Sequence, residues 1–209
     1  MWEVYVLIFS GRFEMIFKNK KIAGLAAIAA VALPAAAYSA TTNVNVTAEF
    51  RTALVLATTD VAFGILEFSG APAGTDTATI AASTGAITYA GNFSGPSTGT
   101  AGNVQVTAGS DGSTVSVRCE ASATLSDGTE TIDFNLIQVR EEGAGADSAC
   151  VNLSTSSATL VLDIGGGTAD EFAFGGTLDG GTVSGGFGAA VYDTANAGGS
   201  PFQVDIIYQ

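Results

Sequence analysis

The sequence predicts an all-β protein, folded as a sandwich or a barrel. Short runs of β-branched and aromatic residues recur along the chain, and stretches rich in Gly, Ser, Thr, Asn and Asp separate them. No window of useful length has the period of an amphipathic helix, and Thr, Val and Gly stand where a helix would favour Leu, Glu and Lys. We expect one domain over residues 40–209, a length that can bury a substantial core.

Residues 1–39 have the features of a leader with a secretory signal peptide. A basic segment (Lys18, Lys20 and Lys21) precedes an apolar run over Ile22–Ala37, which ends in small residues suited to a signal peptidase. The run is too short to span a bilayer comfortably, so we expect no retained membrane span. Met15 lies just before the basic segment and is a candidate for the true start. These features predict export.

Beyond residue 40 the chain is strongly acidic. It holds 18 acidic residues, the cations Arg51, Arg118 and Arg140, no lysine and no histidine, so its formal net charge is −15. Nucleic-acid affinity depends largely on Lys and Arg at phosphates, so we expect no nucleic-acid partner. An anionic membrane surface would repel the chain. The acidity favours solubility outside the cell.

Two cysteines, Cys119 and Cys150, lie in the part predicted to be exported, where oxidation is permitted. One disulfide between them is the simplest interpretation, and two free or intermolecular thiols are the alternative. Without histidine the pair gives too few soft ligands for zinc.

The first expected strand lies just after the leader. Its apolar residues Val44, Val46, Ala48 and Phe50 alternate with polar ones, which is typical of a strand with one buried face. Asp111-Gly112 and Asp127-Gly128 are hairpin-type turn signals. The glycine-rich stretches 91–102 and 165–188 are expected to form extended loops or short edge hairpins. The other expected strands are 61–68, 86–89, 103–107, 114–121, 131–140, 158–164, 171–174, 187–192 and 202–208.

Two motifs could carry ligand chemistry. Residues 163–168 (DIGGGT) resemble the phosphate-binding loop of the actin and sugar-kinase fold, but that fold needs a second loop and a longer chain, so a strand ending in a glycine turn is the preferred interpretation. Calcium could bind carboxylates among the glycines (Asp163, Asp170, Glu171 and Asp179). The repeat signature of calcium β-rolls is incomplete, which favours solvated loop acids.

Catalysis has few candidate groups. The absence of histidine excludes the Ser-His-Asp and Cys-His arrangements. The single tryptophan, Trp2, lies in the leader, so the rest of the chain has no Trp platform for sugar stacking. A glycosidase-type carboxylate pair stays open, because the sequence does not give distances between carboxylates. We expect no enzyme, no catalytic residue and no cofactor.

The last strand carries Phe202, Val204, Ile206 and Tyr208 on one face. Both this strand and the one over 43–50 could be ordinary strands of one sandwich. Alternatively, a terminal strand could complete the sheet of a neighbouring subunit. Burial of the four apolar side chains of the N-terminal strand would contribute roughly 6–12 kcal/mol as an upper bound.

Three segments carry a resemblance to a known family. They are 59–66 (TDVAFGIL, with the pattern D-φ-x-F-G-x-φ, where φ is apolar), 103–107 with 109–117, and the closing strand 202–209. Together they resemble a bacterial secreted, Ig-like domain family of unknown function that is related to the Mat/Ecp type of fimbrial major subunit. The two cysteines, the insert around 140–149 and the long stretch 165–188 depart from its simplest members.

The resemblance implies an Ig-like β-sandwich that acts as a structural subunit of a bacterial surface filament. It implies self-association by N-terminal donor-strand exchange, with Val44, Val46, Ala48 and Phe50 as the donor strand. A periplasmic chaperone would contact the C-terminal strand (Phe202, Val204, Ile206 and Tyr208), and an outer-membrane usher would assemble the fimbria at the cell surface. The alternative is a self-contained secreted adhesin or glycan-binding sandwich.

Overall fold

The computed structural model describes residues 6–9, 12–15, 47–166, 170–183 and 186–209. The chain divides into two compact units, Met1–Thr47 and Ala48–Gln209. In the first, β1 (Val6–Phe9) and β2 (Arg12–Met15) form an antiparallel pair. The apolar run predicted as part of a signal peptide lies outside the described residues. Within the described segments, no helix has the length and hydropathy needed to cross a membrane.

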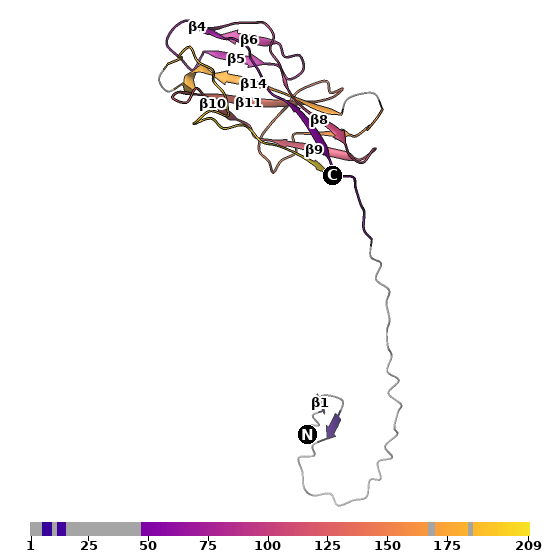
Figure 1. The fold of residues 1–209 in the computed structure, drawn as a ribbon. Helices are drawn as coiled ribbons and strands as arrows, with labels where there is room; N and C mark the ends of the chain where they lie inside the picture. Colours follow the sequence, from indigo (N-terminus) through magenta and orange to yellow (C-terminus); the bar gives the residue numbers. More distant parts are fainter. Residues whose placement is uncertain (1–5, 10–11, 16–46, 167–169, 184–185) are drawn as a thin grey trace, which may run out of the picture. The chain divides into compact units, whose positions relative to one another are not determined.

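The second unit consists of antiparallel sheets packed as a sandwich, which confirms the predicted all-β class (Figure 1). A short 3₁₀ turn, η1 (Gly180–Thr182), follows β14. The strands are β3 (Val55–Thr59), β4 (Glu67–Phe68), β5 (Thr77–Ile80), β6 (Ile87–Ala90), β7 (Phe93–Ser94), β8 (Gly102–Ala108), β9 (Thr114–Cys119), β10 (Ala123–Ser126), β11 (Thr131–Glu141), β12 (Ser148–Ala149), β13 (Ala158–Val161), β14 (Glu171–Asp179) and β15 (Val204–Tyr208).

The larger sheet is organised around β14. This strand pairs with β11, with β8 through its first half and with β5 through its second half. Outer strands extend the sheet: β3 pairs with β8, β6 with β5, and β10 and β12 with β11. The smaller sheet has the order β13-β9-β15, and β4 and β7 form a separate pair.

The core lies between these sheets. From the smaller sheet, Val115 and Val117 of β9 are fully buried, as expected for a central strand. The ring of Phe202, just before β15, packs against Phe174 of β14 at 5.7 Å and against Phe134 of β11 at 6.4 Å between centroids. Fully or nearly fully buried apolar side chains of the larger sheet complete the core: Ala78, Ile80, Phe134, Ile137, Val139, Phe172, Phe174 and Leu178.

The central position of β14 corrects the expectation that 165–188 is a loop or an edge hairpin. Two glycines in the middle of the strand make this stretch resemble a loop, but both are required by close packing. A Cβ on Gly175 would lie 2.3 Å from the carbonyl oxygen of Ile80, and one on Gly176 would lie 2.6 Å from the ring of Phe134. Glycine here permits neighbouring atoms to approach the backbone closely.

Several other expectations also differ from the structure. Asp127-Gly128 connects the paired strands β10 and β11, which confirms that hairpin, but Asp111-Gly112 connects β8 to β9, which belong to different sheets. Residues 187–192 form no strand, and within 61–68 only Glu67–Phe68 are a named strand. The sequence pattern predicts no strand at the positions of β3, β5, β10 and β12.

One residue of β11 has an unusual backbone conformation. Between the pairs Asn135–Thr177 and Gln138–Gly175 the register shifts, because β11 has one residue more than β14. Leu136 occupies this bulge with φ +50°, and its side chain is 72% exposed. It is the one residue other than glycine with positive φ in the described part of the chain.

Candidate functional site at the open edges of β3 and β15

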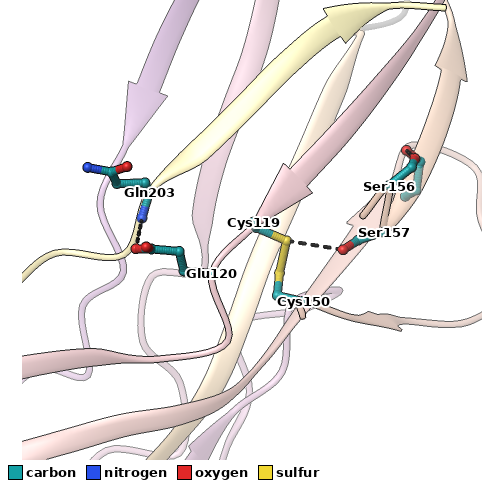
Figure 2. Close-up of a disulfide and its surroundings, with 7 residues drawn as sticks. Cys119, Glu120, Cys150, Ser156, Ser157 and Gln203 are labelled. Carbon is teal, nitrogen blue, oxygen red and sulfur yellow. Dashed lines mark hydrogen bonds between the residues drawn. A yellow bond between two sulfur atoms is a disulfide. The ribbon is translucent and has the colours of Figure 1, made fainter. Parts of the chain in front are cut away.

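The predicted disulfide between Cys119 and Cys150 is present (Figure 2). Cys119 ends β9 of the smaller sheet, whereas Cys150 directly follows β12 of the larger sheet, so the bond joins the two layers. Both cysteines are buried. The Ser157 hydroxyl donates to the Cys119 sulfur at 3.6 Å. These surroundings make the disulfide a structural link in the core.

The C-terminal strand β15 forms one edge of the smaller sheet. Its residues Val204, Ile206 and Tyr208 pair with the buried Cys119, Val117 and Val115 of β9, so they share the core-facing side. They are only half-buried, as is Phe202. The other edge of β15 has no strand partner among the described residues. The predicted contact of these four residues with a chaperone stays a prediction.

The strand β3 forms an edge of the larger sheet, and all five of its residues are exposed. Leu56 lies opposite Val106 of β8, which is buried, so the Leu56 side chain points to the same face of the sheet. Leu56 is nevertheless 42% exposed. As far as the described residues go, the core-facing side of β3 therefore lacks the cover that β8 receives. Its segment, VLATT, also contains no charge and no proline, the usual features that protect an edge strand from pairing.

The beginning of β3 and the end of β15 meet at one corner of the domain, where Figure 1 shows the C-terminus beside the first residues of the second unit. The Tyr208 hydroxyl donates to the carbonyl oxygen of Thr52 at 2.6 Å. It also accepts a hydrogen bond from the backbone N–H of Ser110 at 2.7 Å. Two open strand edges, one from each sheet, thus start from a shared corner.

At its other edge, the smaller sheet lies close to the larger one. Ala158 and Thr159 of β13 line a depression together with Glu141 and Ser148, which belong to β11 and β12. The residues of β13 therefore lie against a part of the same domain. The β13 edge of the smaller sheet is therefore partly covered by the larger sheet, whereas the side formed by β3 and β15 is more open.

The predicted donor strand lies partly outside the described residues, because Val44 and Val46 belong to the part that is not described. Ala48 and Phe50 are exposed and form no strand, and the Phe50 side chain is 92% exposed. In this structure Ala48 and Phe50 therefore do not pack as a strand of their own sandwich.

The glycine turn after β13 is held by carboxylates of the protein. Asp170 is 5% exposed, and both oxygens of its carboxylate accept from the backbone N–H of Asp163, at 3.0 and 3.1 Å. Asp111 accepts from the N–H of Ile164 at 3.1 Å. These bonds make Asp163–Gly166 a structural turn, which agrees with the interpretation preferred over a phosphate loop.

The four carboxylates considered for calcium do not all come together, because Asp179 lies apart from the other three. Asp170 and Glu171 lie at the start of β14 and Asp179 lies at its end. Eight residue steps of a strand separate the two ends by about 26 Å. Asp179 instead accepts from the N–H of Gly181 at 2.9 Å and caps η1. In the described part of the chain no group of three or more metal-binding side chains could hold an ion.

A cluster of acids does form beside the start of β14. Burial raises the pKa of Glu142 above its ordinary range, and the negative charges of Glu171, Asp170 and Asp163 raise it further. Like charges that raise a pKa destabilise the ionised form of the protein at neutral pH. The sequence pattern does not indicate this cluster, because Glu142, which directly follows β11, meets Glu171 of β14 only in the fold.

In comparisons of the chain with known proteins, no family model, no curated protein and no solved structure matched. The resemblance to fimbrial subunits therefore rests on the sequence segments alone, and the candidate site is defined by geometry: two open strand edges that meet at Tyr208.

Proposed function

We propose that the chain is a structural subunit of a bacterial surface filament, assembled when the N-terminal segment of one copy adds a strand to the next copy. The observation that carries this proposal is the uncovered core-facing side of β3 next to the free edge of β15. A strand placed there would extend the smaller sheet beyond β15 and cover Leu56, whose side chain is 42% exposed.

The segment over residues 41–50 has the properties that such a strand needs. Its apolar residues recur with a period of two, so all four could point to the core while the polar residues between them point to solvent. Their burial would contribute roughly 6–12 kcal/mol as an upper bound, before the hydrogen bonds of the strand ladder are counted. That magnitude would support a durable polymer.

Export and assembly follow from the same proposal. The leader would direct the chain out of the cytoplasm, and a periplasmic chaperone would cover the open edge of β15 until an outer-membrane usher joins the subunits. Chaperone contact along β15 would protect an edge that carries one charged side chain, Asp205. The fimbria would then lie at the cell surface or outside the cell.

The test is the oligomeric state of the protein comprising residues 41–209, made under oxidising conditions and measured by size-exclusion chromatography with light scattering. Three variants are compared with it: deletion of residues 41–50, Val46→Asp and Asn45→Asp. The two substitutions introduce the same charge one residue apart, on opposite faces of the predicted strand. We expect stable multimers from the parent and from Asn45→Asp, and monomers from the deletion and from Val46→Asp.

A parent protein that is a well-behaved monomer would refute the proposal. The self-contained adhesin or glycan-binding sandwich would then become the better hypothesis, and a screen against glycans would follow. Multimers that survive the deletion would also refute it, because the association would not depend on the N-terminal segment.

A further inference from the structure

A network of polar contacts fixes the point where the N-terminal segment joins the domain. The guanidinium of Arg51 forms an ion pair with Glu49 at 2.7 Å and donates to the carbonyl oxygen of Gln209 at 3.0 Å. It also lies 5.1 Å from the centre of the Tyr208 ring, within the range of a cation–π contact. One of the three cations beyond residue 40 is thus committed to joining the two ends of the domain.

The neighbouring residue is held through its backbone. Thr52 donates its N–H to the hydroxyl of Ser110 at 2.7 Å, and its carbonyl oxygen accepts from the Tyr208 hydroxyl at 2.6 Å. Tyr208 in turn accepts from the N–H of Ser110. Both backbone polar groups of Thr52 are therefore bonded to parts of the chain more than 50 residues away.

We infer that Arg51, Thr52 and Tyr208 form a latch that prevents the N-terminal segment from completing its own domain. The inference rests on the proposed function. A segment that filled its own open site would have to reverse direction just before β3, so residues 51–54 would form a hairpin turn. In the structure these residues form neither a turn nor a bend, and the hydrogen bonds of Thr52 to Ser110 and Tyr208 hold them in that conformation.

The latch has a direct consequence for assembly. Ahead of it, Ala48–Phe50 are exposed and belong to no strand, which keeps the segment available to another copy. An open latch would allow the segment to turn back into the site beside β15. That intramolecular event needs no partner and would compete with exchange between copies. Arg51 and Tyr208 are thus positioning residues for the exchange.

The test uses the protein comprising residues 41–209 and the variants Tyr208→Phe and Arg51→Gln. Tyr208→Phe keeps the ring in the core and removes only the hydroxyl that bridges Thr52 and Ser110. Arg140→Gln is the matched control for charge, because Arg140 pairs with Asp147 at 3.2 Å outside the latch. In Tyr208→Phe, the rate of trypsin cleavage after Arg51 reports the opening of the latch, because Arg51 must leave its latch contacts to enter the protease. Cleavage is detected by mass as the loss of residues 41–51.

We expect Tyr208→Phe to be cleaved after Arg51 about fivefold faster than the parent, as for the loss of one net hydrogen bond. We also expect both latch variants to shift from multimers toward folded monomers, with Arg140→Gln unchanged. If the latch variants stay as multimeric as the parent although trypsin shows an open latch, the latch inference fails and the proposed function stands. If the parent itself is monomeric, the proposed function fails and the inference fails with it. Should Tyr208→Phe not fold, the oligomeric state of Arg51→Gln decides: folded monomers support the latch, and multimers like those of the parent refute it.

Discussion

Replacing the leucine of the β11 bulge with glycine is expected to stabilise the protein. Leu136 has φ +50°, and its side chain is 72% exposed, so it gains little from burial. A residue with a Cβ costs roughly 1–2 kcal/mol in the left-handed region. Glycine removes that cost. Its greater freedom in the unfolded chain lowers the free energy of unfolding by about 0.5–1 kcal/mol, which offsets part of the gain. The net gain for Leu136→Gly is about 0.5–1 kcal/mol, which for a domain of this size corresponds to about 1–4 °C in Tm.

The matched control is Leu136→Ala, which removes the same exposed side chain and keeps the Cβ. The assay is thermal and urea unfolding of all three proteins with the disulfide intact. Leu136→Gly should exceed Leu136→Ala in free energy of unfolding by about 0.5–1 kcal/mol, because the two differ only in the Cβ. A glycine variant less stable than the alanine variant would refute the argument that the backbone at this position is strained.

Two further predictions concern the core and the acidic cluster. Replacing Cys119 and Cys150 together by alanine should lower the free energy of unfolding by about 3–4 kcal/mol, which is the loop-entropy value for their separation of 31 residues. The measurement is urea unfolding, and a loss below about 1 kcal/mol would contradict the prediction. Glu142→Gln should raise the stability at neutral pH, because burial and the charge of Glu171 raise the pKa of Glu142 in the folded state. Protonation of Glu142 therefore stabilises the fold. The stability gained by Glu142→Gln should be full above the raised pKa and should vanish as the pH falls below the ordinary value of 4.5. The measurement is Tm across pH, and Glu141→Gln is the control.

The sequence predicts the class of this fold because alternation, turn residues and the lack of helical periodicity all indicate strands. The disulfide could be predicted too, because the part predicted to be exported has only two cysteines. The half-buried C-terminal strand follows from the same alternation, with Val204, Ile206 and Tyr208 on one face.

What the sequence missed depends on contacts between distant segments. The strand β14 contains Gly175 and Gly176, which look like turn residues until Ile80 and Phe134 are seen to occupy the space a Cβ would need. Residues 187–192 look like a strand because they are apolar, yet Phe187 and Tyr192 contribute to an aromatic cluster from an irregular segment. Tertiary packing outweighs the local pattern in both cases.

The open edge formed by β3 could not be predicted for a related reason. Its segment, VLATT, has a composition typical of a strand, but only the structure shows that it pairs on one side and is exposed on both faces. The latch also joins residues that are more than 150 positions apart, Arg51 with Gln209 and Thr52 with Tyr208. Such contacts leave no local signal in a single sequence.

The pairing of β14 also determines when the domain can form as the chain is made. Its partners β5, β8 and β11 all precede it, and β5 ends at Ile80, about 90 residues before β14 begins. At a synthesis rate of 5–20 residues per second, this interval lasts about 5–20 s. During that time the emerging chain holds strands whose central neighbour does not yet exist, so the larger sheet cannot close. If the predicted leader directs the chain across a membrane, this order would favour export, because late closure would keep the chain extended until most of it has been made.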